Sequence, residues 1–531
     1  MAKTGLLIGS NPSRIFKLLP KIQKEVLNTF YIQYLPESKL TTLLKHQNLP
    51  GNLGDVSSHP IVEKYYRNTL SIKHLKVRVL LASFSNPLYF SKIITKTPID
   101  IMYFDRVLNP DEIKMVENFV LNKSASFKCV PFDDSNVSAP SSNEESKSAS
   151  ELDVNASVKT FYDSVVLGGT FDRLHHGHKI LLSEAVLRCC KKLTVGVTDV
   201  PMLKSKKLWE LIESTEIRIH KVSNFLEDVS PHIQFDITPI TDMYGPTKDD
   251  PTFQMLVVSA ETARGGDKIN EIREKNGLNK LDVYYVPLLE NDDFYFEEEE
   301  SKVSSSNIRI RLLGTLLKPP EARPNLPARP YIIGLTGGIA SGKSSIGQKL
   351  IKLGAGYVNC DILAHQLYEV GKPAYKSIVE TFGDAILNED KSINRQALGK
   401  IVFSNEIELN RLNSILWPAI LEEAKKEAMK LYKENKTEVV VMEAAVLIRA
   451  GWKTEVHEVW TSIIPSEEAV KRMMERYQSS REDVLKRLES QPTNSDYVDS
   501  ANIVFCTLWS PKFTQTQVET AWNDLQNRLK S

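Results

Sequence analysis

Residues 331–344 of this chain read Tyr331-Ile332-Ile333-Gly334-Leu335-Thr336-Gly337-Gly338-Ile339-Ala340-Ser341-Gly342-Lys343-Ser344. The apolar beginning predicts a buried β-strand, and the remainder matches the Gly-x4-Gly-Lys-Ser pattern. Glycines allow backbone N–H groups to surround phosphate oxygens, and the helix that follows points its positive end toward them. The order strand, loop, helix therefore predicts an α/β fold with a phosphate-binding loop. A glycine-rich turn that binds nothing is the alternative, and the preceding strand disfavours it.

Two side chains of this loop have predicted roles. Lys343 would contact the β- and γ-phosphates of a nucleotide and neutralise the charge that develops on them. Ser344 would hold Mg²⁺, which we therefore expect as a cofactor.

A second stretch with phosphate chemistry lies in the middle of the chain. Ser164–Thr170 predicts an apolar strand that ends in glycines, a helix is expected from about His178, and Leu193–Val197 predicts a second strand. Such a βαβ unit indicates a parallel sheet with a ligand at the carboxyl ends of its strands. His175 and His178 then lie at the helix entrance, where histidine can donate to phosphate oxygens.

Other roles stay open for these histidines. Each one alone could cap the helix or be a satisfied polar residue. His175, His176 and His178 could also bind a metal, since imidazoles are good zinc ligands, but no nearby cysteine or carboxylate completes a metal-site spacing. The spacing His-x-Gly-His behind a strand that ends in glycines favours phosphate binding.

The composition is that of ordinary globular material in more than one domain. The chain has 531 residues, too many for one core, and 25% of them are charged. Lys+Arg and Asp+Glu are both 67, so the charge balance gives no argument for nucleic acid or an anionic membrane and favours small-molecule substrates. The five cysteines have neither metal-ligand nor disulfide spacing, which fits a reducing compartment.

The sequence also predicts where the protein is found. No apolar run approaches the ~20 residues that span a bilayer, and the first residues lack the pattern of a signal peptide. We therefore expect a cytoplasmic protein without a transmembrane segment. The first two dozen residues carry several lysines and no acid before Glu25, a weak resemblance to a transit peptide that leaves mitochondrial association open. An exposed basic helix face is the favoured interpretation.

Two segments divide the chain into three parts. Residues 133–157 are rich in Ser, Asn, Glu and Asp and predict a disordered linker. Residues 318–330 are rich in proline and predict an extended spacer that holds its neighbours apart. We expect an N-terminal α/β domain at 1–132, a middle domain at 158–317 and a C-terminal domain at 331–531.

The sequence says least about the role of the N-terminal domain. Gly5–Ile8 and Val77–Ala82 predict strands among helical stretches. The turn at Gly9–Pro12 imitates a phosphate loop only faintly, and a plain turn is favoured. Our hypothesis is a regulatory, docking or assembly role, with a protein partner bound through residues 1–132.

The middle domain contains two stretches that resemble signatures of the nucleotidyltransferase superfamily, which transfers an adenylyl or cytidylyl group from a nucleoside triphosphate. They are Gly168–His178 and Ser304–Arg309, and their order along the chain is the expected one. In the second, hydroxyls, amide groups at a helix start and an arginine bind the triphosphate. The resemblance implies a Rossmann-like fold with an ATP site formed by Gly169, Thr170, Phe171, His175, His178, Arg264, Ser304, Ser305, Ser306 and Arg309.

Further blocks specify the member of this superfamily. Asp242–Thr247 and Leu256–Thr262, which Arg264-Gly265-Gly266 continues, are similar to the eukaryotic and archaeal type of phosphopantetheine adenylyltransferase. The resemblance covers about residues 164–317.

This resemblance also implies roles for single residues. Thr170 and His178 would contact the reacting phosphates, and Lys204 would help to hold phosphate. Lys206 and Lys207 are close enough in the sequence to take the place of Lys204, and all three could instead form a solvated charged turn.

Residues from Tyr331 to about Lys530 resemble dephospho-coenzyme A kinase, a P-loop kinase. The resemblance implies that Asp361 accepts or orients the proton of a ribose 3′-hydroxyl as it attacks the γ-phosphate, although an aspartate after a strand can also cap a helix. Glu443 ends the predicted strand Val439–Glu443 and would support Mg²⁺ or substrate. The arginines that resemble those of the kinase lid, and that could also be surface charges, are Arg472, Arg476 and Arg487. Trp417, Arg449 and Tyr477 depart from the family pattern, which puts acceptor affinity and lid contacts in doubt.

The order of the two domains resembles the bifunctional coenzyme A synthases of animals. It implies that ATP and 4′-phosphopantetheine form dephospho-CoA and diphosphate, and that ATP and dephospho-CoA then form CoA and ADP. One alternative is a scaffold that keeps nucleotide folds without catalysis, which the intact Thr170, His178, Lys343 and Asp361 disfavour. The other is a related nucleotidyltransferase–kinase fusion with a different acceptor, because substrate specificity is where sequence reasoning is weakest.

Overall fold

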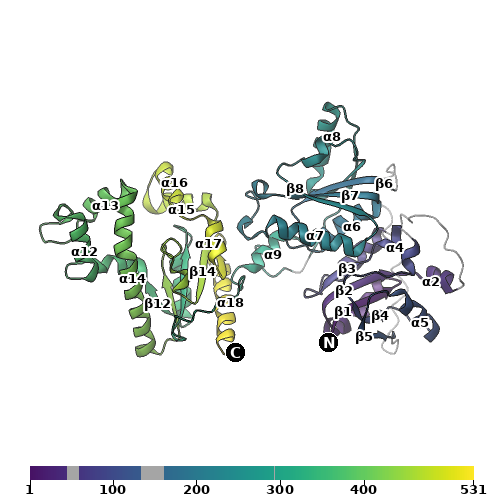
Figure 1. Cartoon of the computed structure of the whole chain (residues 1–531), viewed down its shortest axis with the longest axis horizontal. Coiled ribbons are helices and arrows are strands. Elements are labelled where there is room, and N and C mark those ends of the chain that lie inside the picture. The colour runs from purple at the N-terminus through teal and green to yellow at the C-terminus, as the bar shows by residue number, and fades with distance from the viewer. Residues whose placement is uncertain (45–58, 86, 133–160, 292–293, 531) are drawn as a thin grey trace. The chain divides into compact units, whose positions relative to one another are not determined.

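Three parallel β-sheets organise the chain (Figure 1). The computed structural model describes residues 1–44, 59–85, 87–132, 161–291 and 294–530. The linker that we predicted at 133–157 lies outside the described residues. The predicted α/β fold with parallel sheets is confirmed for all three parts of the chain. No helix in the described ranges is both long and apolar enough to cross a membrane.

The N-terminal domain has a sheet of strand order β3-β2-β1-β4-β5. Its strands are β1 (Ala2–Gly9), β2 (Val26–Tyr34), β3 (Lys76–Val79), β4 (Ile99–Phe104) and β5 (Lys123–Val130). Its helices are α1 (Leu19–Glu25), α2 (Glu37–Leu44), α3 (His59–Asn68), α4 (Ala82–Ser85) and α5 (Pro110–Phe119). The strand predicted at Gly5–Ile8 lies within β1. The one predicted at Val77–Ala82 ends at Val79, because a helix already begins at Ala82.

The middle domain has a sheet of strand order β10-β9-β6-β7-β8. Its strands are β6 (Tyr162–Gly169), β7 (Cys189–Thr198), β8 (Gln234–Ile240), β9 (Met255–Ser259) and β10 (Asp282–Val286). Its helices are α6 (His176–Arg188), α7 (Thr215–Val229) and α8 (Ala263–Lys275), and α9 (Ser305–Leu312) follows. The first strand is central, with the second and third on one side and the fourth and fifth on the other. The N-terminal sheet has this same order.

The C-terminal domain has a sheet of strand order β12-β13-β11-β14-β15. Its strands are β11 (Tyr331–Gly337), β12 (Gly356–Asn359), β13 (Val439–Glu443), β14 (Glu458–Ile463) and β15 (Ile503–Cys506). Its helices are α10 (Lys343–Lys352), α11 (Cys360–Leu367), α12 (Pro373–Phe382), α13 (Arg395–Phe403), α14 (Glu406–Asn435), α15 (Ser466–Tyr477), α16 (Arg481–Glu489), α17 (Asn494–Ser500) and α18 (Pro511–Lys530). Every residue of β13 and β14 is buried, as expected for parallel strands covered on both faces.

The chain forms two compact units, and their limits differ from the predicted spacer. The first contains residues up to 294 and 300–306, and the second contains 295–299 and the residues from 307 onward. Residues 318–330 therefore belong to the second unit. Lys318 Nζ donates to the carbonyl oxygen of Asp499 (2.6 Å), and Asn502 donates to that of Lys318 (3.1 Å). These bonds attach the first residue of the proline-rich segment to residues just before β15.

Candidate active sites

The loop after β11 holds the phosphate-binding residues predicted for the C-terminal domain. It runs from the end of β11 at Gly337 to the start of α10 at Lys343. Gly337 and Gly342 have φ angles of +140° and +86°, which disfavour any side chain, and Ala340 has φ +61°. A Cβ atom at Gly342 would also lie 2.7 Å from Cγ2 of Thr507. The glycines are therefore required by the loop conformation, and the strain at Ala340 is typical of a ligand-binding loop.

The polar side chains of this loop are engaged with one another and with the sheet. Lys343 Nζ donates to the carbonyl oxygens of Gly337 and Gly338, at 2.9 Å each. Ser344 Oγ donates to Oε1 of Glu443 (2.8 Å), a carboxylate that is only 2% exposed. Burial lowers the pKa of the Lys343 ammonium, and the charges of Glu443 and Asp361 oppose that shift. The predicted Lys343, Ser344 and Glu443 thus form one cluster.

Three neighbouring strand ends assemble this cluster. Glu443 is in register with Leu335 of β11 on one side and with Asn359 of β12 on the other. Asp361 follows β12 directly and lies in the first turn of α11. Partial removal from water raises the pKa of the Asp361 carboxyl above its usual range, Lys343 lowers it, and Glu443 raises it further. A carboxylate with a raised pKa is a better proton acceptor, which suits the role predicted for Asp361.

The predicted lid arginines differ in what they contact. Arg472 on α15 donates to the carbonyl oxygen of loop residue Ala340 (3.3 Å) and to that of Thr507 (2.7 Å). These bonds brace the loop between β11 and α10, and the expected closure of Arg472 over a phosphate stays a prediction. Arg476 and Arg487 have exposed side chains on α15 and α16, and the Arg476 guanidinium lies 5.2 Å from the centre of the Tyr477 ring.

Two loop supports were missed by sequence reasoning. Gln491 Oε1 accepts the backbone N–H of Ile339 (2.9 Å), and Thr507 Oγ1 donates to the carbonyl oxygen of Ser341 (2.9 Å). Both residues are more than a hundred positions away from the loop, and neither belongs to a local pattern. Only the packing of α16 and β15 brings them to it.

The middle domain has its predicted site in the loop between β6 and α6. Phe171 and Arg173 have φ angles of +50° and +47°, so this loop is strained as well. The Phe171 ring is fully buried, and a Cβ atom at Gly169 would lie 2.9 Å from it. Glycine at 169 is therefore needed for the ring to pack there. Thr170 Oγ1 accepts a hydrogen bond from Thr198 Oγ1 at the end of β7 (3.1 Å).

Two of the three histidines lie together. His175 caps α6, since its Nδ1 accepts the backbone N–H of His178 at 3.4 Å, and the two rings stack with centres 3.8 Å apart. The His176 ring lies instead against Tyr66 of the N-terminal domain, with ring centres 5.7 Å apart, and its Nε2 is 3.4 Å from Thr69 Oγ1. The three rings do not face a common point, and the described residues contain no His, Cys, Asp and Glu group arranged for a metal. The geometry gives the zinc alternative no support.

The remaining predicted residues lie near the same edge of the middle sheet. Lys204, Lys206 and Lys207 are exposed in the turns that follow β7, and Arg264 is exposed at the second position of α8, after β9. The carboxyl ends of β7 and β9 flank that of β6. Ser305, the first residue of α9, contacts this edge, since its Oγ donates to the carbonyl oxygen of Asp172 (2.8 Å). The predicted serines on or beside α9 are Ser304, Ser305 and Ser306, and Arg309 follows one turn further along as a buried residue.

Arg218 on α7 is a support of this loop that sequence reasoning missed. Its fully buried guanidinium donates to the carbonyl oxygens of Thr170 and Thr198, at 2.8 Å each, and so joins the loops that follow β6 and β7. It also donates to Thr215 Oγ1 (2.9 Å). In the sequence, this arginine has the appearance of any charged residue on a helix.

Replacing Arg218 by methionine is expected to lower the free energy of unfolding of the first unit by about 1–3 kcal/mol, because buried carbonyl oxygens lose their donor. Urea unfolding monitored by circular dichroism measures this loss. Arg67→Met on α3, where the arginine is exposed and paired with Glu63, is the matched control and should leave the unfolding midpoint nearly unchanged. An unchanged midpoint for Arg218→Met would contradict the bracing role.

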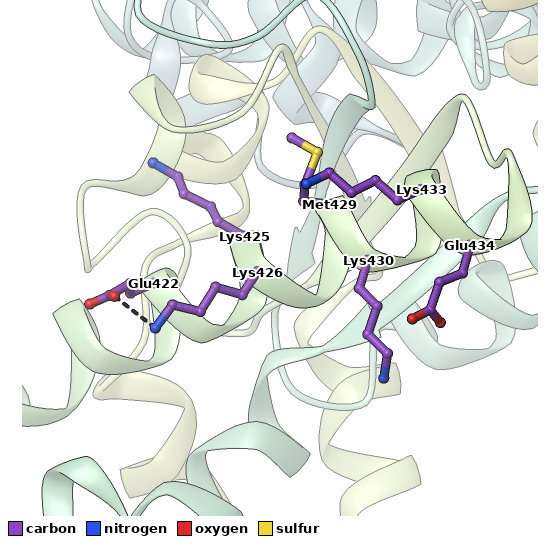
Figure 2. A pocket seen from close by; sticks show the side chains of 7 residues that line it. All are labelled: Glu422, Lys425, Lys426, Met429, Lys430, Lys433 and Glu434. Carbon is purple, nitrogen blue, oxygen red and sulfur yellow. Dashed lines mark ion pairs between the residues drawn. The ribbon is translucent and has the colours of Figure 1, made fainter.

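An open cavity of about 520 Å³ lies beside the second half of α14. Figure 2 shows the seven side chains that line it projecting from this one helix. They are Glu422, Lys425, Lys426, Met429, Lys430, Lys433 and Glu434. Lys426 pairs with Glu422 at 2.8 Å, and none of the predicted site residues lines the cavity. We therefore assign neither reaction to it.

Comparison with known proteins gives independent information on both sites. Residues 331–507 match the family model of dephospho-CoA kinase, and residues 166–311 match that of cytidylyltransferase-like proteins. A dephospho-CoA kinase of Carboxydothermus hydrogenoformans is 39% identical over 189 residues, which are 36% of this chain and 91% of that protein. The dephospho-CoA kinase of Moorella thermoacetica is 36% identical over 199 residues, 38% of this chain and 94% of that protein. The solved dephospho-CoA kinase of Campylobacter jejuni is 24% identical, with a TM-score of 0.30, over 37% of this chain and 97% of its own.

Proposed function

The chain belongs to the dephospho-CoA kinase family through residues 331–507, and we propose that it catalyses two consecutive reactions that end in coenzyme A. The middle domain would join ATP to 4′-phosphopantetheine, and the C-terminal domain would phosphorylate the resulting dephospho-CoA. The observation that carries this proposal is the presence of two phosphate-binding loops of different design in one chain. One is followed by the stacked His175 and His178, and the other by Lys343 and Ser344.

In the first reaction, an oxygen of the 4′-phosphate would attack the α-phosphorus of ATP, and diphosphate would leave from the opposite side. No covalent intermediate with the protein is needed, so catalysis is positioning and neutralisation of charge. His178 and Thr170 support this role because they lie at the positive end of α6 and at the end of β6. His175 is held beside His178 as the cap of the helix.

In the second reaction, the ribose 3′-hydroxyl of dephospho-CoA would attack the γ-phosphorus of a second ATP. Asp361 would take the hydroxyl proton as the new O–P bond forms, and ADP would leave with the electrons of the broken bond. Lys343 would neutralise charge on the transferred group. The raised pKa of Asp361 supports its part in this step.

Ser344 and Glu443 fit Mg²⁺, because they place two oxygen donors 2.8 Å apart next to the phosphate-binding loop, and this cation prefers oxygen ligands. An ion held there would supply positive charge next to the phosphates of ATP. Ser344 would hold the ion, and Glu443 would orient the Ser344 hydroxyl. Tyr357 in turn donates to Glu443 (2.5 Å) and fixes the direction of its carboxylate.

Product analysis by mass spectrometry tests the proposed pair of reactions. The purified chain with ATP, Mg²⁺ and 4′-phosphopantetheine is expected to form CoA, diphosphate and ADP, and with supplied dephospho-CoA it should form CoA and ADP alone. CTP in place of ATP should give no nucleotide adduct of phosphopantetheine. If dephospho-CoA is phosphorylated but phosphopantetheine is never adenylylated, the middle domain has another acceptor, and a panel of phosphorylated acceptors with ATP or CTP would identify it.

Replacing Glu443 by glutamine should raise the Mg²⁺ concentration for half-maximal kinase rate by about 10–100-fold, because the negative charge of the group that orients Ser344 is lost. The kinase rate measured over a Mg²⁺ titration checks this. Glu438→Gln, an exposed residue just before the same strand, is the control and should titrate like the parent. Parent-like Mg²⁺ dependence of Glu443→Gln would remove Glu443 from the metal site.

A further inference from the structure

The N-terminal and middle domains share one hydrophobic core. Ile15, Val62 and Tyr66 of the N-terminal domain belong to the same buried cluster as Leu182 and Val222 of the middle domain. The backbone N–H of Leu81 donates to the carbonyl oxygen of Val229 (2.8 Å), so a main-chain hydrogen bond also joins the two domains. The first 132 residues are therefore not an appendage that could detach without exposing apolar surface.

The N-terminal sheet has the same strand order as the middle sheet. The backbone N–H groups after its first strand, which could bind an anion, already donate to a carboxylate of the chain. The turn after β1 donates the backbone N–H groups of Ser10 and Asn11 to Oδ2 of Asp105, at 2.6 and 2.9 Å. Ser10 Oγ donates to Oδ1 of the same carboxylate (3.0 Å), and Asp105 is 1% exposed. The chain's own carboxylate thus takes the donors that would otherwise hold a phosphate. A nucleotide site at this edge is disfavoured, and the domain needs another explanation.

A buried charge of the middle domain finds its partners in the N-terminal domain. Asp228 near the end of α7 is 2% exposed. It accepts hydrogen bonds from Tyr31 Oη (2.7 Å) and from the backbone N–H of Lys96 (2.8 Å), and it pairs with Arg78 of strand β3. A carboxylate away from water is tolerated only with such partners. Residues 1–132 therefore supply the hydrogen-bond and charge partners that this buried carboxylate of the middle domain needs.

The same contact surface reaches the first turn of α6, where His178 lies. Lys179, the residue after His178, is buried and donates from Nζ to the carbonyl oxygen of Val77 on edge strand β3 (3.0 Å). His176, two residues before His178, lies against Tyr66 of α3 and Thr69 just after that helix. Burial and Lys179 lower the pKa of His176 to about 3, so its ring is neutral near pH 7. Two neighbours of His178 are thus attached to the N-terminal domain.

We propose that the N-terminal domain orients the first turn of α6, with Lys179 as the positioning residue for His178. The inference rests on the adenylyl transfer proposed for the middle domain. Because His175 caps the same turn and stacks on His178, a rotation of the turn would displace both rings together. β3 and α3 of the N-terminal domain contact this turn, β3 through Lys179 and α3 through His176. Residues 1–132 thus have a partner within the chain, the middle domain. The hypothesis that they also bind another protein stays a prediction.

The test compares both reactions in the same samples of the full chain. Lys179→Met and Arg78→Met should each lower kcat of adenylyl transfer by about tenfold or more. KM for ATP and phosphopantetheine should stay within about twofold of the parent, since the predicted binding residues outside this turn stay in place. Phosphorylation of supplied dephospho-CoA should be unchanged. Arg78→Lys, which keeps the charge beside Asp228, should restore most of the rate. Lys123→Met, an exposed lysine on β5 at the opposite edge of the N-terminal sheet, is the matched control and should act as the parent does.

A nuclear magnetic resonance readout keeps the inference testable apart from the proposed reaction. The ring signal of His178, assigned by its absence in His178→Ala, should shift in Lys179→Met and Arg78→Met and stay in place in Lys123→Met. An unmoved His178 signal together with parent-like kcat would overturn the positioning role. An equal loss of both reactions would overturn it too, because it would indicate general destabilisation. If the parent itself does not adenylylate phosphopantetheine, the proposed reaction fails, and the ring signal alone decides the inference.

Discussion

Lys343→Met is expected to stop the chain at dephospho-CoA. Lys343 Nζ lies against the phosphate-binding loop, bonded to Gly337 and Gly338, and methionine keeps the length of the side chain but removes its charge. Loss of a group that stabilises developing charge in a transition state costs about 10²–10³-fold in kcat. With ATP, Mg²⁺ and 4′-phosphopantetheine, mass spectrometry should show dephospho-CoA accumulating at the parent's initial rate while CoA formation nearly ceases.

The control for this variant lies on the same helix. Lys352 is the last residue of α10 and is exposed, so Lys352→Met removes an equal charge far along the helix from the loop. It should convert dephospho-CoA as the parent does. CoA formation at the parent rate by Lys343→Met would place the phosphoryl transfer elsewhere and contradict the site built around Lys343, Ser344 and Glu443.

His178→Ala is expected to block the first reaction and spare the second. The variant loses a ring that stacks on His175 and packs 5.3 Å, centre to centre, from the buried Phe171. Adenylyl transfer should fall by about 10²–10³-fold, because a donor to the reacting phosphates is lost. No dephospho-CoA should form from phosphopantetheine, whereas supplied dephospho-CoA should still become CoA. Diphosphate release measures the first reaction, and ADP release from supplied dephospho-CoA measures the second.

Two further variants separate chemistry from stability in this prediction. His220→Ala removes an exposed histidine from α7 and should leave both reactions unchanged. His178→Gln keeps an N–H donor and should recover part of the lost rate. Equal rates of diphosphate release in the parent and His178→Ala would mean that His178 does not contact the reacting phosphates, and the proposed mechanism of the first reaction would need another residue.

The fold of all three parts could be predicted from the sequence because its signals are local. The run Tyr331–Leu335 and the glycines after it form β11 and its loop, and the strand ending at Gly169 forms β6. Gly342 adopts a positive φ, and Gly169 leaves room for the ring of Phe171, so each glycine is required by the local conformation of its loop. Local requirements of this kind appear in the sequence as a short fixed pattern.

Contacts between polar residues far apart in the sequence could be predicted only where one of them lies at the end of a predicted strand. Glu443 was predicted at the end of a strand, and the register of β13 between β11 and β12 brings it to Ser344. Arg472 was predicted on the correct helix, but its contacts with Ala340 and Thr507 were not. The structure therefore adds a bracing contact for this arginine, and its expected contact with phosphate stays a prediction.

The sequence of this chain was enough to predict both of the loops that we propose to bind phosphate, because a loop of that kind is made by consecutive backbone groups whose conformation depends on the residues in place. The supports of these loops, Arg218 for one and Gln491 with Thr507 for the other, were decided only by the tertiary structure. So was the attachment of α6 to the N-terminal domain through Lys179 and Asp228. Buried polar groups must find partners wherever packing brings them, and no spacing along the chain records which distant residue that will be.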